Sequence, residues 1–153
     1  MDNDSFPDFF YRGISSVHFI NANKKPSIEA FAFDKDIRED GYRELSINWE
    51  YSADALKVLF LQKKADNSIQ FSAGATKLNF PLLKEVTSQY VEMGKFNYEK
   101  REVSDNPFHG NLLFKPDLNN KLQAKQDESM IRNTLAMIAS IEPIIDNPEV
   151  QKI

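Results

Sequence analysis

The sequence predicts an α+β fold: a mostly antiparallel sheet, one short internal helix, and a C-terminal helix packed on the sheet. Three observations lead to this prediction. Aromatic and β-branched residues fill short runs between residues 9 and 114. Turn-forming residues separate those runs. After residue 118 the apolar residues recur at helical spacing among polar ones.

The first strands are expected near the amino terminus. Residues 9–20 are rich in aromatic and β-branched side chains around Gly13, which is typical of two short strands or of one bulged strand. Residues 27–33 carry apolar side chains on both faces of an extended chain, which predicts a central strand. Residues 34–43 are dense in charge and contain Asp40-Gly41, so we expect a solvated loop there.

A strand followed by a short helix is expected next. Residues 45–50 alternate between apolar and polar side chains, and this pattern predicts a half-buried strand with Trp49 on the buried face. Ser52 can cap a helix, which we place at roughly residues 53–64. A further strand is predicted over residues 69–76.

The second half of the chain contains one ambiguous segment. Residues 81–93 can open as a short helix, but the composition after residue 86 favours a strand. Residues 96–103 read as a strand, and 108–114 as a short strand interrupted at Gly110. The last helix is predicted over 128–141, capped by Asp127 or Ser129 and stopped by Pro143, with a start as early as 118.

Composition and charge narrow the possible functions. No repeat or linker divides the chain, so one domain over residues 1–153 is expected, with 1–8 and 146–153 as loose tails. A net charge of −4 argues against a nucleic-acid partner. The absence of cysteine removes thiol chemistry. No apolar run approaches the ~20 residues of a membrane span, and the acidic start is unlike a signal peptide. We therefore expect a cytoplasmic protein without a membrane partner.

Catalytic and cofactor motifs find little support in the sequence. No glycine-rich phosphate loop is present, and the two histidines have no ligand neighbours at metal-binding spacing. Neither a cofactor nor a metal is therefore expected. His18 lies in an apolar run and is interpreted as structural. His109 lies in a turn before a strand and is the better catalytic candidate, because loops on a rigid scaffold often carry function.

Two resemblances extend this reading. Tyr11-Arg12-Gly13 resembles the first-strand arginine motif of ADP-ribosyltransferase-like toxins, in which the guanidinium holds the phosphates of NAD. Ser27 could stand for that family's serine element, although its full Ser-Thr-Ser pattern is missing. Residues 126–128 have the spacing of its Gln-x-Glu element, but at a helix start rather than on a strand. This resemblance implies an enzyme that acts on a nucleotide-like substrate through Arg12, Ser27 and His109.

The second resemblance is to small uncharacterised bacterial proteins. They share Tyr-Arg, Ser-x-x-Ala-Phe, Leu-Ser-x-Asn and Asn-Pro-x-His segments, which here are Tyr11-Arg12 and residues 27–31, 45–48 and 106–109. The similarity spans residues 9–110 and implies no known activity.

Three function hypotheses follow. The first is a non-enzymatic accessory or protein-interaction domain of a bacterial cytoplasmic system, whose partner is a protein rather than a small molecule. The alternative is the enzyme with Arg12, Ser27 and His109 in one concave pocket. An interaction domain should instead expose a sizeable apolar patch. The third is a single-stranded nucleic-acid binder, which the acidic balance disfavours and which would use Phe96, Tyr98, Lys100 and Arg101.

Overall fold

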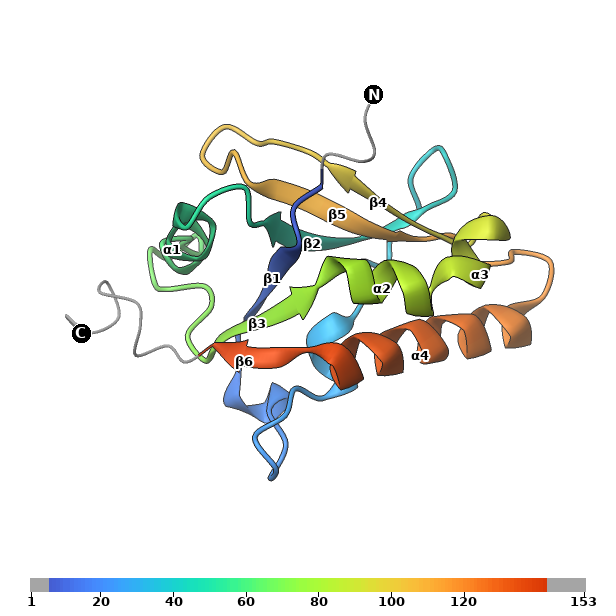
Figure 1. Cartoon of the computed structure of the whole chain (residues 1–153), viewed down its shortest axis with the longest axis horizontal. Coiled ribbons are helices and arrows are strands. Elements are labelled where there is room, and N and C mark those ends of the chain that lie inside the picture. Colours follow the sequence, from blue (N-terminus) through green and yellow to red (C-terminus); the bar gives the residue numbers. More distant parts are fainter. Residues whose placement is uncertain (1–5, 143–153) are drawn as a thin grey trace.

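A six-stranded antiparallel sheet forms the centre of the molecule (Figure 1). The computed structural model describes residues 6–142, and the strands lie in the order β4-β5-β2-β1-β3-β6. Every neighbouring pair is antiparallel. The α+β class and the antiparallel sheet are therefore confirmed. The strands are β1 (Phe9–Ile14), β2 (Arg43–Trp49), β3 (Gly74–Asn79), β4 (Phe96–Lys100), β5 (His109–Phe114) and β6 (Ser140–Glu142).

Residues 6–142 contain four helices, three of them internal where one was expected. They are α1 (Asp54–Phe60), α2 (Phe80–Val86), α3 (Ser88–Glu92) and the long α4 (Lys121–Ile138). The ambiguous segment 81–93 is helical. Asn79 explains its start, because its side chain accepts a hydrogen bond from the Leu82 N–H at 2.9 Å and Pro81 occupies the first turn.

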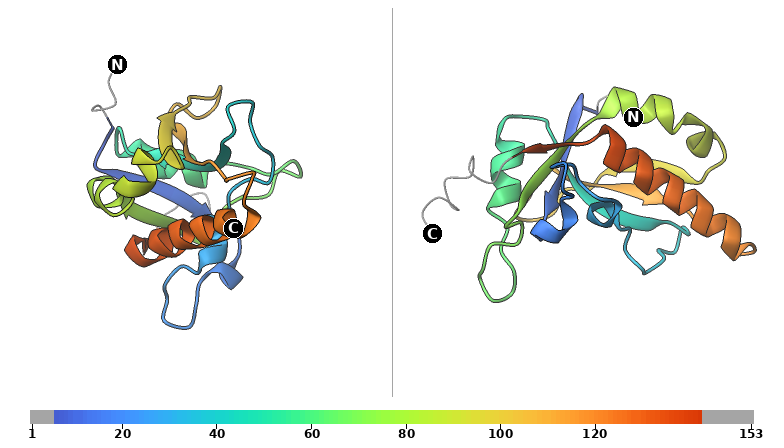
Figure 2. Two further views of the ribbon diagram at one scale, coloured as in Figure 1. Left: turned by 90° about the vertical axis from the view of Figure 1, so that its right-hand side faces the viewer. Right: turned by 90° about the horizontal axis from the view of Figure 1, so that it is seen from below.

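The main hydrophobic core lies between the sheet and α2 and α4, which run alongside each other (Figures 1 and 2). Trp49 is fully buried in it, as its alternation with Leu45 and Ile47 predicted. The Trp49 ring centroid lies 4.6 Å from that of Phe6 and 5.0 Å from that of Phe80. Phe6 falls within the tail expected at residues 1–8 but packs on this core. The tail expected at 146–153 lies outside the described residues.

The central strand predicted over residues 27–33 is wrong. The chain instead forms a 3₁₀ turn, η3 (Ile28–Phe31), packed between the sheet and α4. Ala30, Phe31 and Phe33 are buried there. Apolar side chains on both faces therefore reflect burial of a compact turn, not pairing in the sheet.

Several other element boundaries differ from the prediction. The strand expected over 9–20 ends at Ile14 and is followed by a 3₁₀ turn, η2 (Val17–Phe19), whose cap is the Ser16 hydroxyl. The internal helix expected at 53–64 ends at Phe60, and β3 begins at Gly74 rather than residue 69.

The strand β5 and the helix α4 also differ in detail. β5 runs through Gly110 without interruption. Glycine fits this position because a side chain there would meet the Trp49 indole and the Glu99 carbonyl. Asn120 caps α4 by accepting from the Gln123 N–H at 3.1 Å, so neither Asp127 nor Ser129 does. Asp127 is instead buried and pairs with Lys95 at 2.8 Å.

Among residues 6–142, α1 is the one helix that packs on the opposite face of the sheet, where it covers one end. A small cluster packs beneath this helix, formed by Tyr11, Ala55, Leu59, Phe60 and Ala75. In Figure 1, α1 stands apart from the other helices. No helix within residues 6–142 is long and apolar enough to cross a bilayer.

Candidate functional site

Arg12 connects two backbone segments of the fold. Its Nε donates to the Ala30 carbonyl in η3 at 3.1 Å, and its Nη1 donates to the Ser46 carbonyl in β2 at 3.0 Å. The ladder between β1 and β2 is short, with Phe10 and Tyr11 as its paired residues on β1. Burial lowers the pKa of the Arg12 guanidinium to about 10, so the group remains charged at neutral pH. No described carboxylate forms an ion pair with it. This position favours a structural role.

Ser27 lies near Arg12, whereas His109 does not. The Ser27 carbonyl accepts from the Ala30 N–H at 3.1 Å, which places Ser27 in the same turn that Arg12 contacts. His109 lines a pocket on the α1 side of the sheet, and neither Arg12 nor Ser27 lines that pocket. The structure therefore brings Arg12 and Ser27 to one region and His109 to another.

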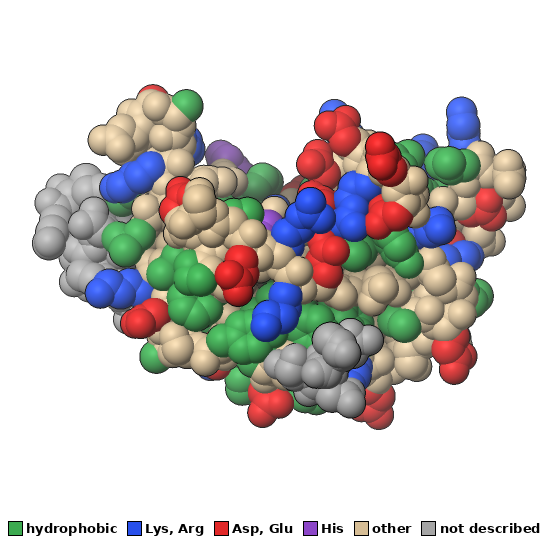
Figure 3. Space-filling model, turned by 90° about the horizontal axis from the view of Figure 1, so that it is seen from above, with side chains coloured by type: hydrophobic (Ala, Val, Ile, Leu, Met, Phe, Trp, Pro, Cys, Tyr) green, Lys and Arg blue, Asp and Glu red, His purple; other side chains and the backbone are tan. Residues whose placement is uncertain are grey.

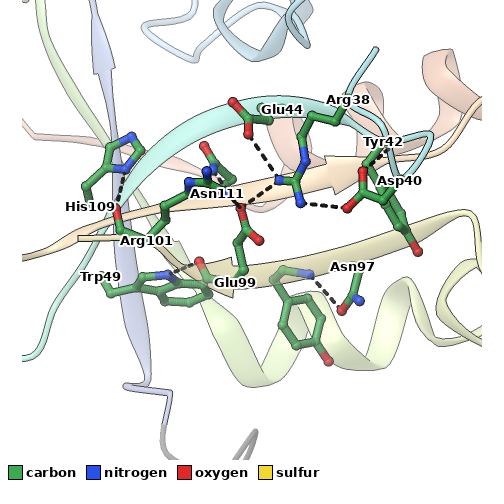
Figure 4. A network of polar contacts seen from close by, with 11 residues as sticks. Arg38, Asp40, Tyr42, Glu44, Trp49, Asn97, Glu99, Arg101, His109 and Asn111 are labelled. Atoms are coloured by element: carbon green, nitrogen blue, oxygen red, sulfur yellow. Dashed lines mark hydrogen bonds and ion pairs between the residues drawn. The ribbon is translucent and has the colours of Figure 1, made fainter. Parts of the chain in front are cut away.

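The ring of His109 is oriented by a backbone carbonyl at the start of β5. Its Nδ1 lies 2.8 Å from the carbonyl oxygen of Arg101 (Figure 4). A carbonyl only accepts hydrogen bonds, so Nδ1 must carry the proton. In the neutral ring, Nε2 is then the hydrogen-bond acceptor.

The His109 pocket has a volume of about 250 Å³ and lies between β1, β2, α1, the segment after α1 and the loop before β5. Its polar side chains come from Ser46, Asn48, Gln62, Gln70, Asn106 and His109. Phe71, Leu59 and Val103 provide its apolar walls. No side chain of Asp, Glu, Lys or Arg lines it among the described residues.

Two buried asparagines hold the loop that presents His109. The Asn106 amide donates to Asn48 Oδ1 at 2.7 Å, and the Asn48 amide donates to the Ala55 carbonyl at 3.1 Å. Asn106 Oδ1 also accepts from the Phe108 N–H at 3.1 Å. Neither asparagine was predicted from the sequence as a site residue. The available signal was an asparagine at the last position of the motif 45–48 and at the first position of the motif 106–109, where burial would require a partner.

A polar network lies beside the pocket on the same face of the sheet (Figure 4). The Arg38 guanidinium contacts Glu99 at 2.8 Å, Glu44 at 3.0 Å and Asp40 at 2.7 Å. Asn111 donates to Glu99 at 2.8 Å. The hydrogen bond to Glu99 is the largest cause of a raised pKa at Arg38. The network therefore fixes the loop 34–42 to β2, β4 and β5.

The surface seen from above is hollowed between two projecting parts, and acidic and basic side chains gather beside the hollow (Figure 3). In the polar network around Arg38, each of the three acidic partners lies within 3.0 Å of its guanidinium, and Arg101 lies 4.0 Å from Glu99.

A second concave surface lies at the beginning of α4. This groove, of about 380 Å³, runs between the loop 34–42, the segment 116–118 and the helix. Its apolar residues are Ile37, Pro116, Leu118 and Ala124, and its basic rim consists of Lys35, Lys121 and Lys125. Leu118 is 69% exposed and Ile37 is 46% exposed. Arg43 and Glu128 pair with each other at 2.8 Å in the same groove.

The aromatic and basic residues of β4 do not form an open stacking platform. Phe96 is fully buried, and Tyr98 packs against Phe80 with ring centroids 4.8 Å apart. The Lys100 ammonium lies 4.4 Å from the centroid of the Tyr51 ring. Among residues 6–142 no group of three or more His, Asp or Glu side chains is placed to hold a metal ion.

No family model, no curated protein and no solved structure matches the chain. Residues from two of the four short motif segments, 45–48 and 106–109, line the His109 pocket, and Gly13 directly follows a third.

Proposed function

We propose that this protein is a non-enzymatic interaction domain whose groove at the start of α4 binds an acidic segment of a partner protein with apolar anchor residues. The observation that carries the proposal is the exposed apolar floor of the groove beneath a lysine rim. Its placement in a bacterial system rests on the sequence resemblance alone.

The apolar part of the groove supports a protein partner. Ile37 and Leu118 come from separate segments but line one groove, and both side chains are largely exposed. Burying apolar surface yields roughly 25 cal/mol per Å². Grooves of this kind bind peptide segments through apolar side chains spaced along one face.

The charge of the rim supports an acidic partner. Lys121 and Lys125 are one helical turn apart on α4 and therefore project from the same face. Lys35 faces them from the loop 34–42, and all three lysines are exposed. Because Arg43 and Glu128 neutralise each other, Asp117 is the acidic residue left to oppose the three lysines in this groove. Such a rim attracts carboxylates and speeds association.

The enzyme alternative has weaker support. An ADP-ribosyltransferase-like site would need Arg12, Ser27 and His109 in one cavity, and the His109 pocket contains only His109 of the three. The pocket also lacks a carboxylate among the described residues that line it. Direct assay for NAD cleavage tests this alternative, and turnover abolished by His109→Ala would favour it.

The proposal is tested with a phage-displayed library of short random peptides selected on the purified protein. We expect selected peptides to combine aromatic or aliphatic residues with Asp and Glu. Their affinity should fall as salt is raised. Leu118→Asp should weaken binding by roughly tenfold or more, as for a central interface residue. The double variant Lys121→Glu, Lys125→Glu should weaken binding and remove most of the salt dependence.

Met137→Asp is the matched control. Met137 lies on the same helix and is 72% exposed, but it does not line the groove. Peptide binding should be unchanged in this variant. Selection of neutral or basic peptides, or equal binding by Leu118→Asp and the wild type, would contradict the proposal.

A further inference from the structure

We propose that the His109 pocket binds the base of a free nucleoside that carries an exocyclic amino group. This site is separate from the groove, because no residue lines both. The inference therefore goes beyond the interaction function proposed above and does not depend on it.

The walls of the pocket suit a flat ring. Gly13 allows the Phe71 ring to lie directly on β1, since an added Cβ at Gly13 would stand only 2.3 Å from the ring atoms. Phe71 therefore forms one apolar wall, and Leu59 and Val103 extend the apolar surface. Aromatic side chains of this kind stack on the faces of bases.

The scarcity of charged side chains among the described residues that line the pocket limits the charge of the group that binds there. Among the described residues that line it, none is acidic, and the only basic side chain is the imidazole of His109. A phosphate would find no arginine or lysine there, and burying an uncompensated anion is costly. The group that enters is therefore uncharged. Any phosphate on the ligand would remain outside.

The free hydrogen-bonding atoms of His109 and Gln62 indicate which polar groups the ligand presents to the pocket. In its neutral form the His109 ring offers Nε2 as an acceptor, because Nδ1 is bound to the Arg101 carbonyl. The Gln62 amide donates to the Val58 carbonyl at 3.1 Å, which leaves Gln62 Oε1 to accept. Two acceptors call for a ligand with two donors. An exocyclic amino group on a planar ring supplies both.

The remaining polar side chains of the pocket can accommodate such a ligand without changing their own contacts. Ser46 and Gln70 can each donate or accept. Asn48 and Asn106 are occupied by their contacts with each other, with Ala55 and with Phe108. They therefore form a fixed wall of a preformed pocket, which lowers the cost of ordering on binding.

The test is calorimetric titration of the full chain with two matched pairs of nucleosides. Adenosine is compared with inosine, and cytidine with uridine, since each pair exchanges an amino group for a carbonyl. We expect the amino member of at least one pair to bind roughly tenfold more tightly. Adenosine and its 5′-monophosphate should bind equally. N-acetylglutamine amide, which presents the NH₂ of a carboxamide, distinguishes a peptide amide from a base.

Paired variants locate the site. His109→Leu and Gln62→Leu should each weaken binding of the preferred amino nucleoside by roughly tenfold, while His18→Leu and Gln89→Leu leave it unchanged. Ser46→Tyr should fill the pocket and abolish binding, whereas Ser140→Tyr, on an exposed strand position, should not. Melting temperatures identify any variant that fails to fold, and the remaining variants then decide.

Three results would overturn the inference. One is binding of the carbonyl nucleosides as tightly as their amino counterparts. A second is no detectable binding of any nucleoside by the folded protein. The third is tighter binding of N-acetylglutamine amide than of every nucleoside, which would assign the pocket to a peptide side chain.

Discussion

The face of the sheet beneath α2 and α4 is packed with aromatic rings, whereas the uncovered part of the other face is held together by polar contacts. On the first face Trp49 contacts Phe6, Phe10 and Phe80, with ring centroids between 4.6 and 5.3 Å apart. On the second, Arg38 and Asn111 converge on Glu99. The aromatic face is stabilised by the burial of apolar rings, whereas the polar face is held by hydrogen bonds and ion pairs.

The two faces differ in how much their side chains contribute to stability. Burial of large apolar side chains contributes several kcal/mol per residue, whereas a partly exposed ion pair contributes about 0–1 kcal/mol. The polar face can therefore change with little loss of stability, and it is the face that carries the His109 pocket.

Trp49→Ala should cause the largest loss of stability. We expect the free energy of unfolding to fall by about 3–5 kcal/mol because the indole is fully buried and its removal leaves a cavity. Urea denaturation measures this change. Trp49→Phe should cost less, since it keeps a ring but loses the bond from Nε1 to the Glu99 carbonyl. Trp49 is the single tryptophan of the chain, so native fluorescence typical of exposed indole would contradict this view.

Arg12→Met should have an intermediate effect on stability. The substitution leaves the carbonyls of Ala30 and Ser46 without their donor, so we expect a loss of about 1–3 kcal/mol in the free energy of unfolding. Peptide binding at the α4 groove should not change. Arg101→Met serves as a control, because the Arg101 side chain is 58% exposed. Unchanged stability in Arg12→Met would restore the ligand-binding role considered from the sequence.

The contrast between the faces also explains which parts of the fold were predictable. Alternation along Leu45, Ile47 and Trp49 is a local signal, and it predicted the buried face of β2 correctly. The prediction of a central strand over residues 27–33 was wrong because a buried turn and a central strand share the same apolar pattern. The turn is fixed by distant contacts, such as that from Arg132 to the Ile28 carbonyl at 3.0 Å.

The His109 pocket was predictable only in part. His109 could be singled out because it follows a turn signal. Gln62, Gln70 and Phe71 carried no such signal, because they reach the pocket through the packing of α1 and of the segment that follows it. Arg12 and Ser27 were candidates for the same site, but they lie in another region since their contacts involve η3.

A double-mutant cycle with Arg38→Met and Glu99→Gln should show a small coupling. We expect about 1 kcal/mol, because both side chains are 24% exposed and therefore partly screened by solvent. The coupling should shrink as salt is raised, while the loss caused by Trp49→Ala should not. A coupling above about 3 kcal/mol would mean that the polar face behaves like a buried pair.

The smallest effect concerns the pH dependence contributed by Asp40. Partial desolvation acts to raise its pKa, but hydrogen bonds from the Tyr42 N–H and the Arg38 guanidinium outweigh it and leave the pKa lowered. A lowered pKa in the folded state means that the unfolded state binds the proton more readily. The stabilisation is therefore complete above the ordinary aspartate pKa and is lost as the pH falls through the lowered one. Asp40→Asn should be less stable than the wild type at neutral pH, and the difference should vanish in acid. Chemical denaturation across this range checks the sign, and a difference that stays constant with pH would show that the charge of Asp40 does not contribute to holding the loop.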